Sequence, residues 1–248
     1  EKGIPAASVD LYLDLDLGMH RTGIALTEGA LALAKRIMHS SSHFFAGVHA
    51  YDGHIHAPDP TARKSEFEEA IRVLESCLAK LSDSGNHRVI RVVSGGSPTF
   101  LFHAEKAMAS KHPWQCSPGT PLLWDAGYGE AFPDLPFTHA AYLLTRVISH
   151  PRPELICLDL GHKAVSAENQ ITRRVFFPEL ENPEFVSQSE EHLVLRLPES
   201  TRPEIGQALL GVPYHVCPTV ALYDEAPTIR DGCVGEEVWK IGARKRTI

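Results

Sequence analysis

The stretch VDLYLDLDLGMHRTG, residues 9–23, joins a short leucine-rich run to a loop that contains two glycines. Residues 9–15 have the length and apolar content of a buried parallel strand. Similar runs follow at 44–49, 88–93 and 121–124, and helices are predicted at 28–38, 61–81 and 101–110. Because strands that alternate with helices are typical of βαβ units, we expect an α/β domain with a parallel sheet.

The pattern changes after residue 135, where β-rich runs are separated by Gly, Pro and Asn. These runs lie at 141–148, 154–160, 174–177, 192–197, 208–212 and 219–223. They predict a mostly antiparallel β domain. We therefore expect an α/β domain over residues 1–135 and a β domain over residues 136–248. Four βα units cannot close an eight-stranded barrel, so the first domain is either an open sheet or half of a barrel.

Composition excludes several classes of protein. The 248 residues are 43% hydrophobic, which is enough for a sizeable core, and 31 acidic residues outnumber 24 basic ones. This balance argues against a nucleic-acid partner. No window approaches the roughly 18 to 20 apolar residues of a membrane-spanning helix, so we expect a cytoplasmic protein without a membrane partner. Five scattered cysteines favour thiols or a metal ligand over disulfides.

Polar loops follow the predicted parallel strands, at the end where α/β folds place their ligands. The loop at 18–23 carries Arg21, whose planar fork suits a carboxylate or a phenolate oxygen, although a solvated loop arginine is an equal alternative. The loop at 51–56 begins with Tyr51, which could stack on a flat cofactor. It ends with His54 and His56, which would share one side of an extended segment and could bind a metal, or could simply be hydrogen-bonded loop residues.

A third loop, Ser94-Gly95-Gly96-Ser97-Pro98-Thr99, lies between a predicted strand and a predicted helix. Small residues expose backbone N–H groups, and the hydroxyls and the helix N-terminus complete an anion site that suits a phosphate. The loop matches neither a Walker motif nor a Rossmann fingerprint, and a plain glycine-rich turn is the alternative. A similar exposed-amide turn is predicted at 117–120.

His215 and Cys217 are two residues apart in a predicted strand and would share one face. Imidazole with thiolate is a zinc-like pair that leaves coordination positions open. A buried cysteine beside a hydrogen-bonded histidine is the alternative.

Taken in order, these segments resemble the D-threonine aldolase and D-serine dehydratase family, which is built on the alanine-racemase-like barrel. Residues 18–23 are similar to the family's Gly-Met-x-Arg-x-Gly loop, 51–54 to its Tyr-x-Gly-His and 94–97 to its phosphate loop. Residues 117–120 are similar to its Arg-Pro-Gly-Thr turn with Ser in place of Arg. Three marks of its C-terminal domain have counterparts at 159–163, 190–192 and 213–217. The resemblance covers nearly the whole chain.

The resemblance implies a lyase that uses pyridoxal phosphate and a divalent metal, with zinc favoured over manganese or magnesium, on small D-β-hydroxy amino acids. The implied cofactor-binding residues are Arg21, Tyr51, Ser94, Gly95, Gly96, Ser97, Gly119 and Thr120. The implied metal ligands are His215 and Cys217. Their His-x-Cys spacing looks more like the dehydratase than the aldolase, and both reactions stay open. By analogy, related barrels often pair, which leaves a homodimer open.

One departure concerns the lysine that anchors the cofactor, which in this family lies in a His-x-Lys context upstream of the Gly-Met-x-Arg loop. No residue here matches it, since His162-Lys163 fits a structural turn of the β domain. We therefore expect the C-terminal half of the barrel, with about four βα units further upstream, and predict no catalytic residue. The rival interpretations are a metal-dependent hydrolase that uses His54 and His56 with Asp125 or another carboxylate, a truncated non-catalytic fragment, and a racemase that would give His215 and Cys217 no role.

Overall fold

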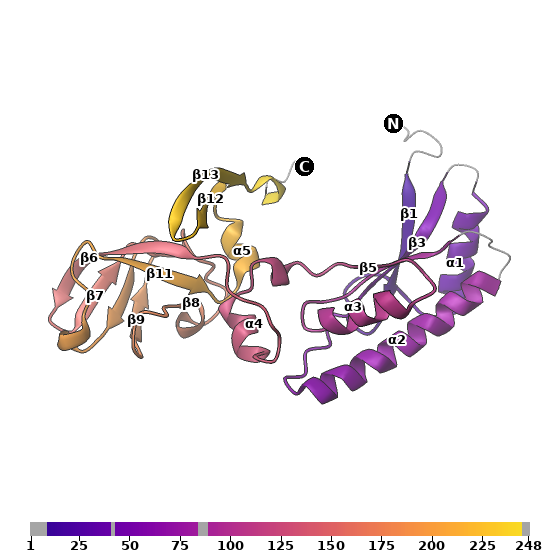
Figure 1. The fold of residues 1–248 in the computed structure, drawn as a ribbon, viewed down its shortest axis with the longest axis horizontal. Coiled ribbons are helices and arrows are strands. Elements are labelled where there is room, and N and C mark those ends of the chain that lie inside the picture. The colour runs from indigo at the N-terminus through magenta and orange to yellow at the C-terminus, as the bar shows by residue number, and fades with distance from the viewer. Residues whose placement is uncertain (1–8, 41–42, 84–88, 245–248) are drawn as a thin grey trace. The chain divides into compact units, whose positions relative to one another are not determined.

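The computed structural model describes residues 9–40, 43–83 and 89–244 and divides the chain into two compact units. The first unit ends at Gly119 and the second begins at Thr120 (Figure 1). Sequence analysis instead divides the chain after residue 135. Residues 120–135 pack with the second unit, where the backbone N–H of Ala140 donates to the carbonyl of Leu123 at 2.7 Å.

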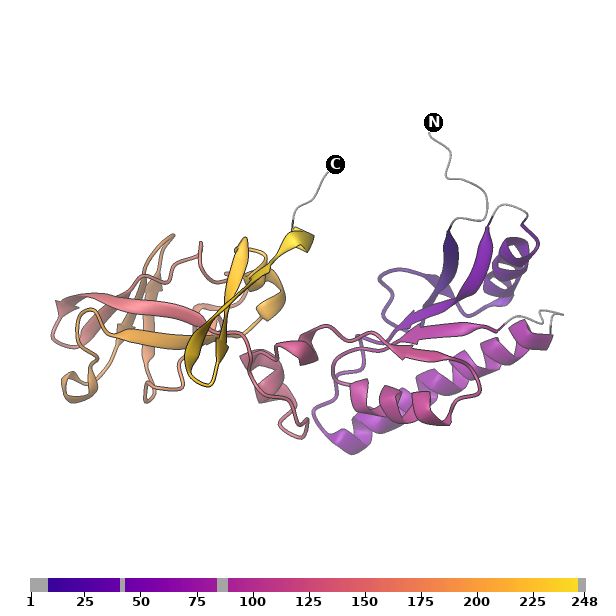
Figure 2. The same ribbon diagram turned by 45° about the horizontal axis from the view of Figure 1, so that its top comes forward.

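A five-stranded parallel sheet forms the centre of the first unit, in the order β2-β1-β3-β4-β5. Its strands are β1 (Asp10–Asp16), β2 (Ile24–Ala25), β3 (Phe44–Tyr51), β4 (Arg91–Ser94) and β5 (Trp114–Cys116). The helices are α1 (Glu28–Met38), α2 (Pro60–Asp83) and α3 (Phe100–Ala109). Figure 2 shows α3 beside α2, where the rings of Phe67 and Phe102 have centroids 5.5 Å apart. The predicted parallel sheet and its three helices are confirmed.

Alternation along the strands gives this sheet one apolar and one polar face. Leu13 and Leu15 of β1 are buried in a core that also contains the apolar stripe of α2. Asp14 and His49, which are partners in the register of β1 and β3, lie on the other face, where Asp14 Oδ1 is 2.6 Å from His49 Nδ1. The ends of β1, β3 and β4 at this sheet's carboxyl edge carry the three polar loops.

The predicted strand at 121–124 is wrong. Thr120–Leu122 forms a short 3-10 helix, η1, because the backbone N–H groups of Leu123 and Trp124 both turn back to the carbonyl of Thr120. The strand next to β4 is the earlier β5, whose three residues are too few to give a recognisable period. The first residue of the predicted strand at 88–93 lies outside the described residues.

A six-stranded antiparallel sheet forms the second unit, in the order β8-β11-β6-β7-β10-β9. Its strands are β6 (Leu143–Arg152), β7 (Leu155–Leu158), β8 (Val175–Phe176), β9 (Glu184–Gln188), β10 (Leu193–Arg196) and β11 (Ala208–Pro213). Leu143, Val147, Ile156, Leu158 and Leu193 are buried in its core. The predicted antiparallel β domain is confirmed.

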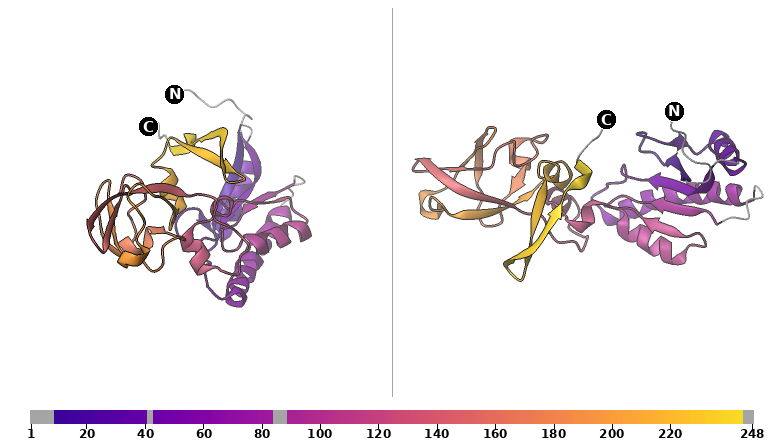
Figure 3. Two further views of the ribbon diagram at one scale, coloured as in Figure 1. Left: turned by 60° about the vertical axis from the view of Figure 1, so that its left-hand side comes forward. Right: turned by 90° about the horizontal axis from the view of Figure 1, so that it is seen from above.

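Shorter elements surround this sheet. They are α4 (Ala126–Ala131), α5 (Val216–Val220), η2 (Ile171–Arg173), η3 (Glu199–Thr201) and η4 (Gly242–Arg244). β12 (Glu225–Arg230) and β13 (Cys233–Lys240) form a separate hairpin, drawn in yellow in Figure 3. The predicted strand at 219–223 is wrong, because α5 occupies the start of this segment. None of the helices among the described residues is long and apolar enough to cross a bilayer.

Candidate functional site

Asp16, the last residue of β1, shapes the loop at 18–23. Its Oδ1 accepts hydrogen bonds from the backbone N–H groups of Gly18 and His20, each at 2.9 Å, and its Oδ2 is 2.8 Å from His20 Nδ1. The backbone bonds from His20 and Gly18, together with the His20 side chain, lower the pKa of Asp16 to about 2. The carboxylate therefore holds a turn in which Gly18 and His20 both have positive φ.

Arg21 and Tyr51, both predicted cofactor residues, lie together in the first unit. Arg21 Cζ is 4.6 Å from the centroid of the Tyr51 ring, a cation–π distance. Tyr51 ends β3 directly beside Asp16 in the register with β1. A Cβ atom on Gly53 would lie 2.3 Å from the Tyr51 ring, so only glycine allows the chain to turn back under that ring. A guanidinium and an aromatic ring thus meet at the carboxyl edge of the sheet.

The loop of residues 94–99 is buried throughout. Ser94 Oγ donates to the carbonyl of Ala50 at 2.9 Å, and the backbone N–H of Ser117 donates to the carbonyl of Ser94 at 3.0 Å. Gly95 has a φ of 119°, which favours glycine, and the loop leads directly into α3. The structure therefore brings the predicted phosphate loop and the start of the predicted 117–120 turn together.

Sequence reasoning missed a buried pair beneath this loop. Asp52 Oδ2 lies 2.8 Å from His103 Nε2, and the two side chains are 1% and 0% exposed. Asp52 Oδ1 and His103 Nδ1 have no hydrogen-bond partner in the described part of the chain. A Cβ on Gly95 would lie 3.0 Å from His103 Cδ2, and one on Gly96 would lie 3.0 Å from Asp52 Oδ1. The pair therefore supports both glycines of the loop from behind.

The two histidines of the alternative metal site have other local roles. His56 Nδ1 is 2.5 Å from the carbonyl oxygen of His54. The His54 ring packs on Gly18, where a Cβ would lie 2.8 Å from its Nε2. Among residues 9–40, 43–83 and 89–244, no three His, Cys, Asp or Glu side chains form a group that could hold a metal. In this part of the chain, therefore, neither His54 and His56 nor His215 and Cys217 belong to a three-ligand group.

His215 and Cys217 are both exposed in the second unit. They do not share a strand as predicted: His215 caps the N-terminus of α5, and Cys217 lies within that helix. His215 Nδ1 is 2.7 Å from Glu168 Oε1, and Cys217 Sγ is 3.8 Å from Thr120 Oγ1. The alternative of a buried core cysteine is wrong, because Cys217 is exposed.

Thr120 and Gly119, the remaining predicted cofactor residues, belong to different units. Thr120 is buried at the start of the second unit, and Gly119 is exposed at the end of the first.

The Lys163 ammonium is 2.9 Å from Glu191 Oε1 and 3.2 Å from Glu190 Oε2, and these contacts raise its pKa. The segments at 159–163 and 190–192 thus pair with each other, which confirms the predicted structural turn.

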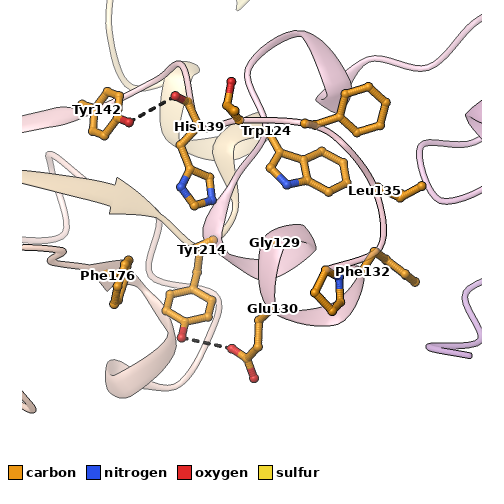
Figure 4. A pocket seen from close by; sticks show the side chains of 13 residues that line it. Trp124, Gly129, Glu130, Phe132, Leu135, His139, Tyr142, Phe176 and Tyr214 are labelled. Carbon is orange, nitrogen blue, oxygen red and sulfur yellow. Dashed lines mark hydrogen bonds between the residues drawn. The ribbon is translucent and has the colours of Figure 1, made fainter.

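A hollow of about 710 Å³ opens beside the segment that carries His215 (Figure 4). Aromatic side chains such as those of Trp124, Phe132 and Tyr214 line it, and Glu130 and His139 are among its polar members. The Tyr214 hydroxyl donates to Glu130 Oε2 at 3.1 Å, and burial followed by this contact raises the pKa of Tyr214. Tyr214 immediately precedes His215, so this hollow and the metal-ligand candidates share one segment.

Comparisons with known proteins agree with this arrangement. Residues 5–114 match the model described as alanine racemase, N-terminal domain, and residues 140–229 match the putative serine dehydratase domain. A D-threonine aldolase of an Arthrobacter species is 30% identical over 96% of this chain and 62% of its own length. A 3-hydroxy-D-aspartate aldolase of Paracoccus denitrificans is 26% identical over 94% of this chain and 60% of its own length.

A solved structure adds the fold. The crystal structure of D-threonine aldolase from Filomicrobium marinum matches 95% of this chain and 63% of its own, with 26% identity and a TM-score of 0.84. This chain thus spans about three fifths of the length of these relatives. The order of the two domains, the parallel and antiparallel sheets and these matches agree: the chain is similar over nearly its whole length to the D-threonine aldolase and D-serine dehydratase-like family, and it has an alanine-racemase-like fold.

Proposed function

We propose that this chain supplies cofactor-binding and metal-binding residues of a pyridoxal phosphate-dependent lyase that acts on small D-β-hydroxy amino acids. The relatives named as aldolases of D-threonine and of 3-hydroxy-D-aspartate support this substrate class. Because the chain spans only 60–62% of those relatives, the reaction of the whole protein is part of the proposal.

The observation that carries the proposal is the buried loop of residues 94–99 between β4 and α3. The loop consists of two glycines, two serines, a proline and a threonine, whose small side chains suit close approach of an anion to the backbone, and a helix N-terminus follows directly. These features fit a phosphate. In the proposal, Ser94, Gly95, Gly96 and Ser97 bind the cofactor phosphate, and Gly119 and Thr120 contribute from the adjoining turn.

Arg21 and Tyr51 are proposed to bind the cofactor ring. Their cation–π contact places a fixed positive charge beside an aromatic face, which suits a flat ring with a phenolic oxygen. Arg21 would orient that oxygen, and Tyr51 would contact the ring. When bound, pyridoxal phosphate withdraws electrons from the substrate's α-carbon, and the metal polarises its β-hydroxyl.

His215 and Cys217 are proposed to bind the divalent metal. Nitrogen with sulfur favours zinc over manganese or magnesium. Glu168 occupies Nδ1 of His215, which leaves Nε2 as the ligand atom, the usual arrangement for a metal-binding histidine. Water or substrate would complete the coordination. A metal that acidifies the hydroxyl promotes aldol cleavage, and one that assists its departure promotes dehydration.

Calorimetric titration of the whole chain tests the cofactor assignment. We expect pyridoxal phosphate to bind more tightly than pyridoxal, because only the former carries the phosphate for the 94–99 loop. Equal affinity for the two compounds would contradict a phosphate-binding role for this loop. The products of D-threonine or a 3-hydroxy-D-aspartate separate the reactions, since cleavage gives glycine together with an aldehyde, and dehydration gives a 2-oxo acid with ammonia.

Metal analysis of His215→Ala and His54→Ala tests the metal assignment and the rival hydrolase together. We expect only His215→Ala to lose bound zinc. Loss of zinc in His54→Ala alone would contradict the proposal and favour the hydrolase.

A further inference from the structure

The local structure around His215 and Cys217 is too short to position their side chains by itself. α5 has five residues, well below the length at which a helix is stable alone, and the His215 side chain makes no capping bond to it. Glu168, the partner of His215, is itself exposed. The segment from Tyr214 to Cys217 therefore depends on contacts from elsewhere in the second unit.

Asp125 provides the strongest of these contacts. The residue is 1% exposed, and its two carboxylate oxygens serve two different helices. Oδ1 accepts from the backbone N–H of Tyr128 at 2.9 Å and caps α4, and Oδ2 accepts from the backbone N–H of Val216 at 2.9 Å. Val216 lies between His215 and Cys217 and 91 residues away from Asp125. A carboxylate that accepts two backbone donors makes charge-assisted, directional bonds.

Two further residues near Asp125, Gly127 and Thr120, contact the segment from Tyr214 to Cys217. The backbone N–H of Gly127 donates to the carbonyl of Tyr214 at 3.2 Å, and a Cβ on Gly127 would lie 2.5 Å from that oxygen. Thr120 Oγ1 lies 3.8 Å from Cys217 Sγ. Residues 120–127, the clamp segment, thus contact Tyr214, Val216 and Cys217 in turn.

The backbone of the clamp segment is held in an unusual conformation just before Asp125. Trp124 has a φ of 44°, a region that bulky residues rarely adopt, although its side chain is buried. Its ring stacks on Tyr128 with centroids 5.3 Å apart and packs on Phe137 at 4.9 Å. Packing of this ring offsets the backbone strain, which persists only where the surroundings hold it. This packing fixes the side chain next to Asp125, whose Oδ2 accepts from the backbone N–H of Val216.

We propose that Asp125 is a positioning residue for the metal ligands His215 and Cys217, and that it acts through the backbone N–H of Val216. This role rests on the proposed function, because it requires that the pair binds a metal. Asp125 does not touch the metal in this scheme. It fixes the chain between the two ligands so that imidazole and thiolate face one ion.

Asp125→Asn is the sharpest test, because the amide offers one acceptor oxygen in place of two and cannot serve both Tyr128 and Val216. Co²⁺ is a suitable probe, since its visible spectrum reports thiolate coordination. We expect the whole chain with Asp125→Asn to bind Co²⁺ about 10- to 100-fold more weakly, the usual cost of losing a group that orients a ligand. The thiolate band should also shift or weaken.

Asp59→Asn is the matched control. Asp59 Oδ2 accepts from the backbone N–H of Ala62 at 2.7 Å near the start of α2, so the substitution also changes a helix-capping aspartate, but in the first unit. We expect its Co²⁺ affinity and spectrum to equal those of the wild type. His215→Ala should lose Co²⁺ in both backgrounds.

Three results would overturn the proposal, and each is distinguishable. Unchanged Co²⁺ affinity in Asp125→Asn would show that the Val216 bond does not position the ligands. If Asp125→Asn binds Co²⁺ weakly but amide exchange is fast throughout residues 120–244, Asp125 stabilises the fold of the second unit and has no specific role in positioning the ligands. Failure of the wild type itself to bind Co²⁺ would remove the proposed metal pair and, with it, this role. Support requires weak binding with faster amide exchange confined to the starts of α4 and α5.

Discussion

In the first unit, the loop of residues 94–99 is buried and offers backbone groups, whereas in the second unit His215 and Cys217 are exposed and offer side chains. Neighbouring parallel strands set the position of the loop, and a fully buried Asp–His pair supports it from behind. The metal-ligand candidates instead depend on a residue 91 positions away. The position of the backbone loop is thus set by the register of the sheet. The position of the exposed His215 and Cys217 side chains is set by hydrogen bonds from residues elsewhere in the second unit.

Removal of the His103 side chain should destabilise the first unit, because it breaks the buried pair with Asp52. His103→Ala leaves the Asp52 carboxylate buried without its partner, and such a loss costs about 3–5 kcal/mol of unfolding free energy. Denaturant unfolding followed by tryptophan fluorescence measures it, and Trp114, whose ring centroid is 6.2 Å from that of His103, contributes to this signal. His112→Ala, which changes a partly exposed histidine of the same unit, should stay within about 0.5 kcal/mol. Equal stability of the two variants would contradict a supporting role for the pair.

Gly95→Ala should damage the loop with less effect on the unit as a whole. The new Cβ would lie 3.0 Å from His103 Cδ2 in a backbone with a φ of 119°, which costs about 1–3 kcal/mol. We expect pyridoxal phosphate affinity to fall about tenfold, equivalent to about 1.4 kcal/mol. Gly242→Ala is the control, because nothing lies within 4 Å of its Cβ position. Unchanged affinity of Gly95→Ala for pyridoxal phosphate would contradict the proposal that the loop binds the phosphate.

Glu168 tests how much an exposed anchor contributes compared with the buried Asp125. Glu168→Ala frees Nδ1 of His215 and should weaken zinc binding about tenfold, the lower end of such effects. Glu168→Gln keeps an acceptor for Nδ1–H and should weaken it less. Both variants should unfold within about 0.5 kcal/mol of the wild type, because the side chain is exposed. Competition with a chromophoric chelator measures the affinity, and equal affinities in all three proteins would contradict the orienting role.

The two units also differ in how far the sequence alone predicts them. Periodicity predicts α1 with the bounds that the structure has, and the strand ends correctly indicate the loops at 18–23, 51–56 and 94–99. Contacts between distant residues have no local signal, which is why Asp52 with His103 and Asp125 with Val216 were missed. β9 and the β12–β13 hairpin were missed as well, because their largely exposed residues do not alternate between apolar and polar. The sequence predicts a strand where α5 begins and ends, because its apolar residues suit a strand as well as a helix, and the bond from Val216 to the distant Asp125 has no local signal.

The smallest expected effect concerns the turn at residues 18–23, which carries Arg21. Asp16 has a pKa of about 2 in the fold against 3.8 when unperturbed, so its contribution to stability is complete above pH 3.8 and is lost as the pH falls through about 2. Carboxyl NMR titration measures this pKa directly. In His20→Gly, which suits the positive φ at this position, the two backbone N–H donors remain. The pKa should therefore rise only part of the way, and a full return to 3.8 would show that the imidazole, and not the backbone, holds the turn.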